Sequence, residues 1–158
     1  MHAGLFITHA RTLRAPTSIT HWLVAFTIHL CRLAGKDGRV IAVDIQERML
    51  HALKRRASKE GHTTKLTTIL SKPNDFVLDV KADVVLSFWM AHEVPDIRHF
   101  FVSVKSIMKA EASFLMAEPL LHVTERRFDD MLKTAEATGF KTVDRPEISF
   151  SYAALLRL

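Results

Sequence analysis

An aspartate that closes a run of apolar residues is the residue of this chain best suited to binding a ligand. The run extends from Val40 to Ile45 with Asp44 near its end, and residues 46–50 that follow have the composition of a helix. A strand buried on both faces of a parallel sheet reads as such a run. A carboxylate where the strand ends can accept hydrogen bonds from both hydroxyls of a ribose. Asp44 is therefore a candidate nucleotide-binding residue. The alternative is that it is a plain strand-end or helix-capping acid.

The glycine-rich loop that usually precedes such an acid is missing from the sequence. A nucleotide site of this kind normally has a glycine-rich loop one helix earlier, because glycine lets the backbone approach the ligand closely. Residues 18–25 are the positions that correspond to this loop, and they contain no glycine. The sequence therefore predicts the ribose-binding acid of a nucleotide site but not the glycine-rich loop that usually completes such a site.

The elements that must position this aspartate alternate between strand and helix from about residue 26 onward. After Asp96, a good helix N-cap, apolar residues recur at helical spacing. The last two strands are joined by too short a segment for a crossover helix, so we expect them to be antiparallel. This order predicts an α/β fold, with a mostly parallel sheet, helices on both faces and an antiparallel C-terminal strand. Strands are expected over 40–45, 65–70, 83–88, 113–117, 142–143 and 151–158, and helices over 26–33, 46–60, 97–108 and 124–138.

The length, charge, hydropathy and cysteine content of the chain argue against several classes of protein. The chain has 158 residues, which suits one domain, and its net charge is +5. Residues 1–36 hold four basic residues and no acid, so residues 37–158 are almost neutral and show no clear nucleic-acid site. The apolar stretch from Ile19 to Cys31 is too short and too interrupted for a membrane span. The lone Cys31 excludes an internal disulfide and indicates a reducing compartment, so we expect a cytoplasmic protein.

The N-terminal segment differs from the rest of the chain. Residues 1–25 are acid-free and rich in Thr, His and Arg. We expect an atypical leader there, disordered or a non-native helix, followed by a single domain over residues 26–158. The composition is also that of a transit peptide, which makes organelle import the alternative localisation. The abrupt change near residue 26 suggests a frameshift, an alternative start or a truncated gene upstream.

Four segments, in the right order, resemble those of class I S-adenosylmethionine-dependent methyltransferases. Residues 35–44 resemble the second strand with its ribose-binding acid, and residues 82–94 resemble the fourth strand and the loop that faces cofactor and substrate. Residues 114–119 resemble the fifth strand, and residues 135–141 resemble the helix-end turn before the sixth. The resemblance covers roughly residues 26–158. It implies a Rossmann-like fold, S-adenosylmethionine as cofactor, and methyl transfer to an unidentified acceptor, a small molecule or another kind of partner.

The resemblance also implies roles for particular side chains. An aromatic face beside a sulfonium cation stabilises it, and a positioned side chain can take the proton that an acceptor loses. The residues with an implied role are Asp44 on the cofactor ribose, Ile45 and Gln46 beside the adenine, Ser87, Phe88 and Trp89 near the methionine part, and His92 or Glu93 as proton acceptors. No residue is expected to bind a metal.

Each of the less certain roles has a structural alternative. Trp89 also fits core packing, and His92 and Glu93 also fit an ordinary loop or helix start. Glu118, which precedes a proline at the end of a predicted strand, fits a substrate-facing acid and a plain strand-end acid equally well. The spacing of these residues does not decide between the alternatives.

The chain departs from the family pattern in several places. The first strand lies at the centre of the family's sheet, and only residues 5–8 are able to supply it, so we expect this strand to be poorly formed or missing. Residues 109–112 stand where the family usually has a Pro-Gly-Gly turn. Residues 71–75 do not clearly present the acid that often holds the adenine amine. Two alternative functions therefore stand beside methyl transfer, a catalytically inactive binding or regulatory module and a nicotinamide-dependent oxidoreductase. The oligomeric state does not follow from the sequence.

Overall fold

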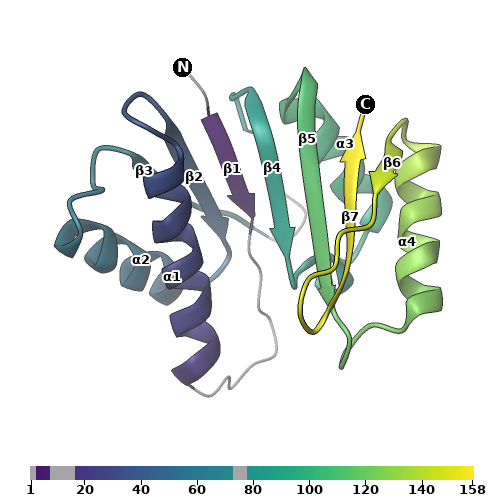
Figure 1. The fold of residues 1–158 in the computed structure, drawn as a ribbon, viewed down its shortest axis with the longest axis horizontal. Helices are drawn as coiled ribbons and strands as arrows, with labels where there is room; N and C mark the ends of the chain where they lie inside the picture. Colours follow the sequence, from purple (N-terminus) through teal and green to yellow (C-terminus); the bar gives the residue numbers. More distant parts are fainter. Residues whose placement is uncertain (1–2, 8–16, 73–77) are drawn as a thin grey trace.

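The fold is a single seven-stranded sheet with helices on both faces (Figure 1). The computed structural model describes residues 3–7, 17–72 and 78–158. The strands lie in the order β3-β2-β1-β4-β5-β7-β6. Their bounds are β1 Ala3–Ile7, β2 Arg39–Asp44, β3 Leu66–Leu70, β4 Ala82–Phe88, β5 Met108–Pro119, β6 Lys141–Asp144 and β7 Ser151–Arg157.

Parallel pairing holds from β3 to β5, and the last two strands are antiparallel. The pairs β1·β2, β1·β4, β2·β3 and β4·β5 are all parallel. Strand β7 pairs antiparallel with both β5 and β6. The predicted α/β fold class and the antiparallel C-terminal strand are therefore confirmed.

The first strand is present, which corrects the expectation that it would be missing. Residues Ala3–Ile7 form β1 at the centre of the sheet, paired with β2 on one side and β4 on the other. The physical reason is the pairing itself, since without β1 two apolar strands would each leave an edge of unpaired backbone groups. Thr8, the last residue of the expected segment, lies outside the described residues. Part of the expected leader over residues 1–25 thus belongs to the sheet.

The helices divide between the two faces of the sheet. Their bounds are α1 Thr17–Leu33, α2 Glu47–Lys59, α3 Ile97–Ile107 and α4 Glu125–Ala137, with a short 3₁₀ helix η1 at Ala91–Glu93. Two consecutive residues of β2 show the division, because their side chains point to opposite faces of the sheet. Ala42 packs with α1 and α2, whereas Val43 belongs to the core under α3 and α4. None of the described helices is long and apolar enough to cross a membrane.

The main core lies between the sheet and helices α3 and α4. Its centre is a cluster of four fully or nearly fully buried phenylalanines, with neighbouring ring centroids 5.4–6.3 Å apart. Helix α3 begins as predicted, because the Asp96 side chain accepts a hydrogen bond from the backbone N–H of His99. This core fixes β4 and β5, the two strands whose ends carry most of the candidate site. The four rings belong to Phe100, Phe101, Phe114 and Phe140.

Strand β5 is longer than predicted, because no separate turn lies between it and α3. Between the pairs Ala82↔Met108 and Val84↔Ser113, β4 advances two residues and β5 advances five. The register of the two strands therefore shifts there by three residues. Lys109 Nζ in this irregular part binds the Asp83 carboxylate of β4 at 2.8 and 2.9 Å. A register shift and an ion pair thus stand where the family usually has its Pro-Gly-Gly turn.

The only cysteine gives a test of the packing of α1. The side chain of Cys31 is 0% exposed, and burial raises the pKa of its thiol, an effect that the nearby Lys65 ammonium opposes only partly. Since the thiolate is the reactive form, we expect negligible modification by Ellman's reagent at pH 7.5 and complete modification in urea. Because the folded pKa is raised, stability is expected to fall as pH rises past the ordinary thiol pKa. Rapid modification of the native protein would contradict this packing of α1.

Candidate functional site

The carboxyl ends of three neighbouring strands meet at one edge of the sheet. Ile7, the last residue of β1, is level with Val43 of β2 and with Ser87 of β4. Asp44 follows Val43 as the last residue of β2, and Phe88 follows Ser87 as the last residue of β4. The two residues therefore lie on opposite sides of β1. Two strand spacings separate them, which is about 10 Å. In open α/β sheets, ligands bind outside the carboxyl ends of the strands at this kind of position.

Asp44 lies buried where β2 turns into α2. Its side chain is 3% exposed, and Oδ1 accepts a hydrogen bond from the backbone N–H of Gln46 at 2.7 Å. This bond spans two residues of the turn before α2, which begins at Glu47, and no side chain caps the helix at its N-cap residue Gln46, so the helix-capping alternative is not confirmed. The bond takes one of the roughly four acceptor positions of a carboxylate. Ile45 and Gln46 are half-buried beside it. The ribose role of Asp44 and the adenine contacts of Ile45 and Gln46 remain predictions.

Ser87, the last residue but one of β4, has a hydroxyl without a hydrogen-bond partner among the described residues. The residue is 1% exposed. A buried hydroxyl without a partner costs free energy of roughly 1–3 kcal/mol, and such groups in native structures call for an explanation. A polar ligand at this edge of the sheet would supply the missing partner. The cofactor role that the resemblance implied for Ser87 remains a prediction.

Phe88 and Trp89 form an aromatic pair after the end of β4. Their rings stack with centroids 5.3 Å apart, and Phe88 also lies 5.7 Å from the ring of Phe26 in α1. Trp89 is half-buried, and its indole Nε1 donates to Ser151 Oγ at 2.9 Å. The ring is thus fixed without being enclosed, which leaves both core packing and a cofactor wall open as roles.

The backbone of Trp89 is in the left-handed region, with φ of 55°. For a bulky residue this conformation is a true outlier, and strain of this kind concentrates at functional sites. Trp89 is held there by its own backbone N–H, which donates to the carbonyl oxygen of Ala117 at 2.8 Å. The turn ends β4 and leads the chain directly into η1.

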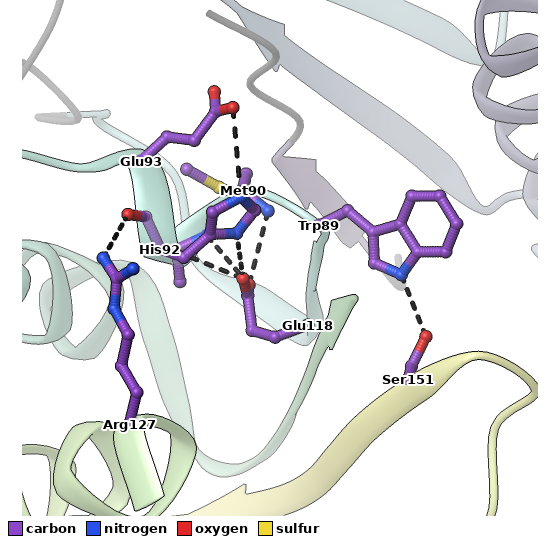
Figure 2. Close-up of polar contacts among 8 residues, drawn as sticks. Trp89, Met90, His92, Glu93, Glu118, Arg127 and Ser151 are labelled. Carbon is purple, nitrogen blue, oxygen red and sulfur yellow. Dashed lines mark hydrogen bonds and ion pairs between the residues drawn. The ribbon is translucent and has the colours of Figure 1, made fainter. Parts of the chain in front are cut away.

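Glu118 is the residue around which the loop after β4 is built (Figure 2). It lies at the end of β5 and is 0% exposed. Oε1 accepts from the backbone N–H groups of Met90 and Ala91 at 3.3 and 2.9 Å, and Oε2 accepts from that of His92 at 3.2 Å. We call this carboxylate and its three N–H donors the Glu118 cradle. The sequence left the role of Glu118 undecided, and its only signal was an acid followed by proline at a strand end.

His92 and Glu93 extend the cradle toward solvent. Nδ1 of His92 is in short contact with Glu118 Oε2, and Nε2 lies 3.9 Å from Glu93 Oε1. The side chains of His92 and Glu93 are 12% and 14% exposed. From α4, Arg127 Nη2 donates to the His92 carbonyl oxygen at 2.9 Å. The structure therefore places both predicted proton acceptors on one loop, beside the buried carboxylate of Glu118, whose role the sequence left open between two alternatives.

The expected position of the cofactor loop needs correction. Residues 18–25 lie within α1, because the helix starts at Thr17. The segment between β1 and α1 therefore comprises residues 8–16, which lie outside the described residues and contain no glycine in the sequence. Residues 73–75, part of the segment considered for the adenine amine, also lie outside the described residues. The part of the chain that is described shows no group of three His, Cys, Asp or Glu side chains able to hold a metal.

Comparison with known proteins gives a family match and a common fold. A family model described as a methyltransferase domain matches residues 25–145. A methyltransferase structure from Aquifex aeolicus, described as SAM-dependent, has a TM-score of 0.74 at 16% identity, with 98% of this chain and 81% of that chain covered. An S-adenosylmethionine-dependent methyltransferase from Clostridium acetobutylicum ATCC 824 has a TM-score of 0.72 at 11% identity, with 98% and 84% covered.

A third similar structure contains sinefungin. The glycopeptide N-methyltransferase MtfA complexed with sinefungin has a TM-score of 0.70 at 14% identity, with 98% of this chain and 80% of that chain covered. At these identities the structures establish a shared fold. No curated protein matches the sequence.

Proposed function

The chain belongs to the methyltransferase-domain family, whose model spans residues 25–145, and we propose that it transfers a methyl group from S-adenosylmethionine to an acceptor bound beside η1. The observation that carries the proposal is the register at the carboxyl edge of the sheet. Asp44 follows the residue of β2 that is level with Ile7, and Ser87 is level with Ile7 on the other side. An acid for a ribose and a buried hydroxyl that finds no partner within the described part of the chain thus flank the central strand, as an extended nucleoside ligand requires.

The described residues provide the contacts for such a ligand. Asp44 accepts hydrogen bonds from the ribose hydroxyls, and Ile45 and Gln46 pack beside the adenine. Ser87 and the stacked pair of Phe88 and Trp89 hold the methionine part. When bound, S-adenosylmethionine supplies an electrophilic methyl group on a positively charged sulfur. An aromatic face next to that charge stabilises it by about 0.5–2 kcal/mol.

The reaction requires mainly that the acceptor be positioned and its nucleophile be free of its proton. His92 and Glu93 are the side chains of this loop able to accept that proton. Both are partly exposed, so an acceptor approaching the end of β4 can reach them. We therefore assign proton acceptance to His92 or Glu93.

A catalytically inactive binding module is the second candidate. It is favoured by one observation, the absence of glycine from residues 8–16 between β1 and α1. Close backbone approach to the cofactor is harder without glycine. A nicotinamide-dependent oxidoreductase is a weaker alternative, because the antiparallel β7 and the segment from Phe88 to Val94 favour a methyltransferase.

Calorimetric titration separates these candidates. The purified protein is titrated with S-adenosylmethionine, with S-adenosylhomocysteine and with a reduced nicotinamide cofactor. We expect micromolar binding of the first two and none of the third. Absence of all binding by a protein that circular dichroism shows to be folded would favour the inactive module, and binding of the nicotinamide cofactor would overturn the proposal.

Trp89 provides a spectroscopic test of the aromatic pair. The chain has two tryptophans, so a Trp22→Phe variant reports on Trp89 alone. We expect its fluorescence to change on titration with S-adenosylmethionine, because the sulfonium lies near the indole. In Trp89→Phe the affinity is expected to fall about threefold, within the range of a cation–π contact. Unchanged fluorescence of Trp89 at saturation would show that this side chain only packs the core.

A further inference from the structure

The loops after β5 and before β7 carry an exposed apolar surface beside the candidate site, and this surface supports an inference that rests on the proposed function and deepens it. We infer that the surface binds the hydrophobic body of the methyl acceptor, so that the acceptor is a small molecule with an aryl or alkyl group. The side chains that form it are Leu120, Leu121 and Phe150, which are 46%, 92% and 78% exposed. We call these three side chains the apolar rim.

A backbone hydrogen bond joins the two loops that carry the apolar rim. Pro119 of β5 is paired in register with Ser151 of β7. One residue further on, the backbone N–H of Leu120 donates to the carbonyl oxygen of Phe150 at 3.0 Å. The two loops therefore continue the pairing of β5 and β7 by one step beyond the end of β5. Single exposed apolar residues are common on proteins, whereas several held in one place mark an interaction or ligand site.

The apolar rim adjoins the candidate site on two sides. Ser151 Oγ, at the start of β7, accepts the hydrogen bond from the indole Nε1 of Trp89 at 2.9 Å (Figure 2). In the other loop, His122 follows Leu121, and its ring lies 6.0 Å from the ring of His92 in η1. Both loops of the rim thus contact the loop after β4, where the acceptor must lie to receive the methyl group.

Phe150 has a backbone conformation that its side chain does not favour. Its φ is 58°, in the left-handed region, where a bulky residue is an outlier. Glycine or asparagine adopts this conformation more easily, and a ring that is mostly exposed gains little from packing in the free protein. Backbone strain of this kind concentrates at active sites and ligand clamps. An exposed aromatic ring on a strained backbone therefore indicates a ligand that covers it.

The surroundings of the apolar rim favour a small hydrophobic molecule over larger partners. Residues 119–130 and 144–151 hold five acidic and three basic residues, a net charge of −2. Such a surface does not attract the phosphates of nucleic acids or of anionic lipids. A stable dimer needs roughly 800 Å² on each partner, or about 20–30 residues, and the rim has three. A small ligand needs only a few apolar side chains around it.

Binding of the neutral naphthalene dye prodan tests the apolar rim without an acceptor, because its emission shifts to the blue in apolar surroundings. We expect saturable binding to the wild-type protein and about tenfold weaker binding to Leu121→Asn and to Phe150→Asn, as the loss of one buried apolar side chain predicts. Asparagine tolerates the left-handed backbone, so Phe150→Asn is expected to keep or raise Tm. The control is Leu33→Asn, which removes a 70% exposed leucine at the end of α1 and is expected to bind prodan as wild type does. Equal binding by all four proteins would overturn the inference.

Turnover tests the class of acceptor. The full chain is incubated with methyl-labelled S-adenosylmethionine and with pairs of compounds that share the accepting group: 2-phenylethylamine with glucosamine, thiophenol with 2-mercaptoethanol, and 2-phenylethanol with glycerol. We expect label on the aryl member of a pair, with KM about tenfold higher in Leu121→Asn and Phe150→Asn and a smaller change in kcat. Preference for the polar members, or an unchanged KM in both variants, would overturn the inference. The dye measurement alone decides the matter if none of these compounds is an acceptor.

Other occupants of the apolar rim, and failure of the proposed function, are seen separately. Cosedimentation with phosphatidylcholine or phosphatidylglycerol vesicles, or a dimer in analytical ultracentrifugation, would overturn the inference if Leu121→Asn abolished it. Failure of the proposed function appears as absence of S-adenosylmethionine binding in calorimetry by a protein that still binds prodan. That result would overturn methyl transfer and, with it, the assignment of the ligand of the rim as a methyl acceptor.

Discussion

Replacing Asp44 by alanine is expected to weaken binding of S-adenosylmethionine about 100-fold. Two hydrogen bonds between a carboxylate and the ribose hydroxyls would be lost, and hydrogen bonds to charged groups contribute about 1.5–3 kcal/mol each. A loss of roughly 3 kcal/mol corresponds to about two orders of magnitude in Kd. The measurement is calorimetric titration of wild type and variant at the same pH and salt concentration.

The matched variant for this experiment is Asp44→Asn. Its amide oxygen can still accept the hydrogen bond that Gln46 donates to Oδ1, so the turn between β2 and α2 is kept. Its amide nitrogen replaces one acceptor, so about a tenfold loss of affinity is expected with little change in stability. Asp37→Ala, at an exposed turn before β2, is expected to change neither quantity. If Asp44→Asn and Asp44→Ala both bound the cofactor as tightly as wild type, Asp44 would be a structural strand-end acid only.

Replacing Glu118 by alanine is expected to lower the free energy of unfolding by about 3 kcal/mol or more. The change leaves three backbone N–H groups without their acceptor in a fully buried place, and each unsatisfied donor costs about 1–3 kcal/mol. For a domain of this length, that loss lowers Tm by roughly 6–12 °C. Thermal unfolding followed by circular dichroism measures it.

The control is Glu111→Ala on the same strand. Glu111 is exposed, and substitutions at such sites usually change stability by no more than about 0.5 kcal/mol. Equal unfolding temperatures for Glu118→Ala and Glu111→Ala would mean that the loop after β4 does not depend on the Glu118 cradle. The positioning of His92 would then lose its structural basis.

The elements with strong local signals could be predicted from the sequence. The strand ending at Asp44 and the helix after Asp96 formed where the apolar pattern and the N-cap indicated. The antiparallel end of the sheet followed from the short segment between β6 and β7. These features depend on neighbours in the chain, which a single sequence displays.

The features that were missed depend on residues far apart in the chain. Strand β1 is only five residues long, and it is defined by its two neighbours rather than by its own composition. The Glu118 cradle needs Trp89 in a left-handed conformation that its side chain does not favour. It also needs the end of β5 to lie beside η1. No local pattern encodes either condition, so the sequence left Glu118 undecided between a substrate-facing acid and a plain strand-end acid.

A crystal structure of the protein with S-adenosylhomocysteine tests the central claim most directly, because it locates the ligand relative to the sheet. We predict that both ribose hydroxyls lie within about 2.7–3.2 Å of the Asp44 carboxylate oxygens. The homocysteine part is predicted to lie against Ser87 and Trp89. A nucleoside bound elsewhere, or no ligand at this edge of the sheet under saturating conditions, would contradict the account.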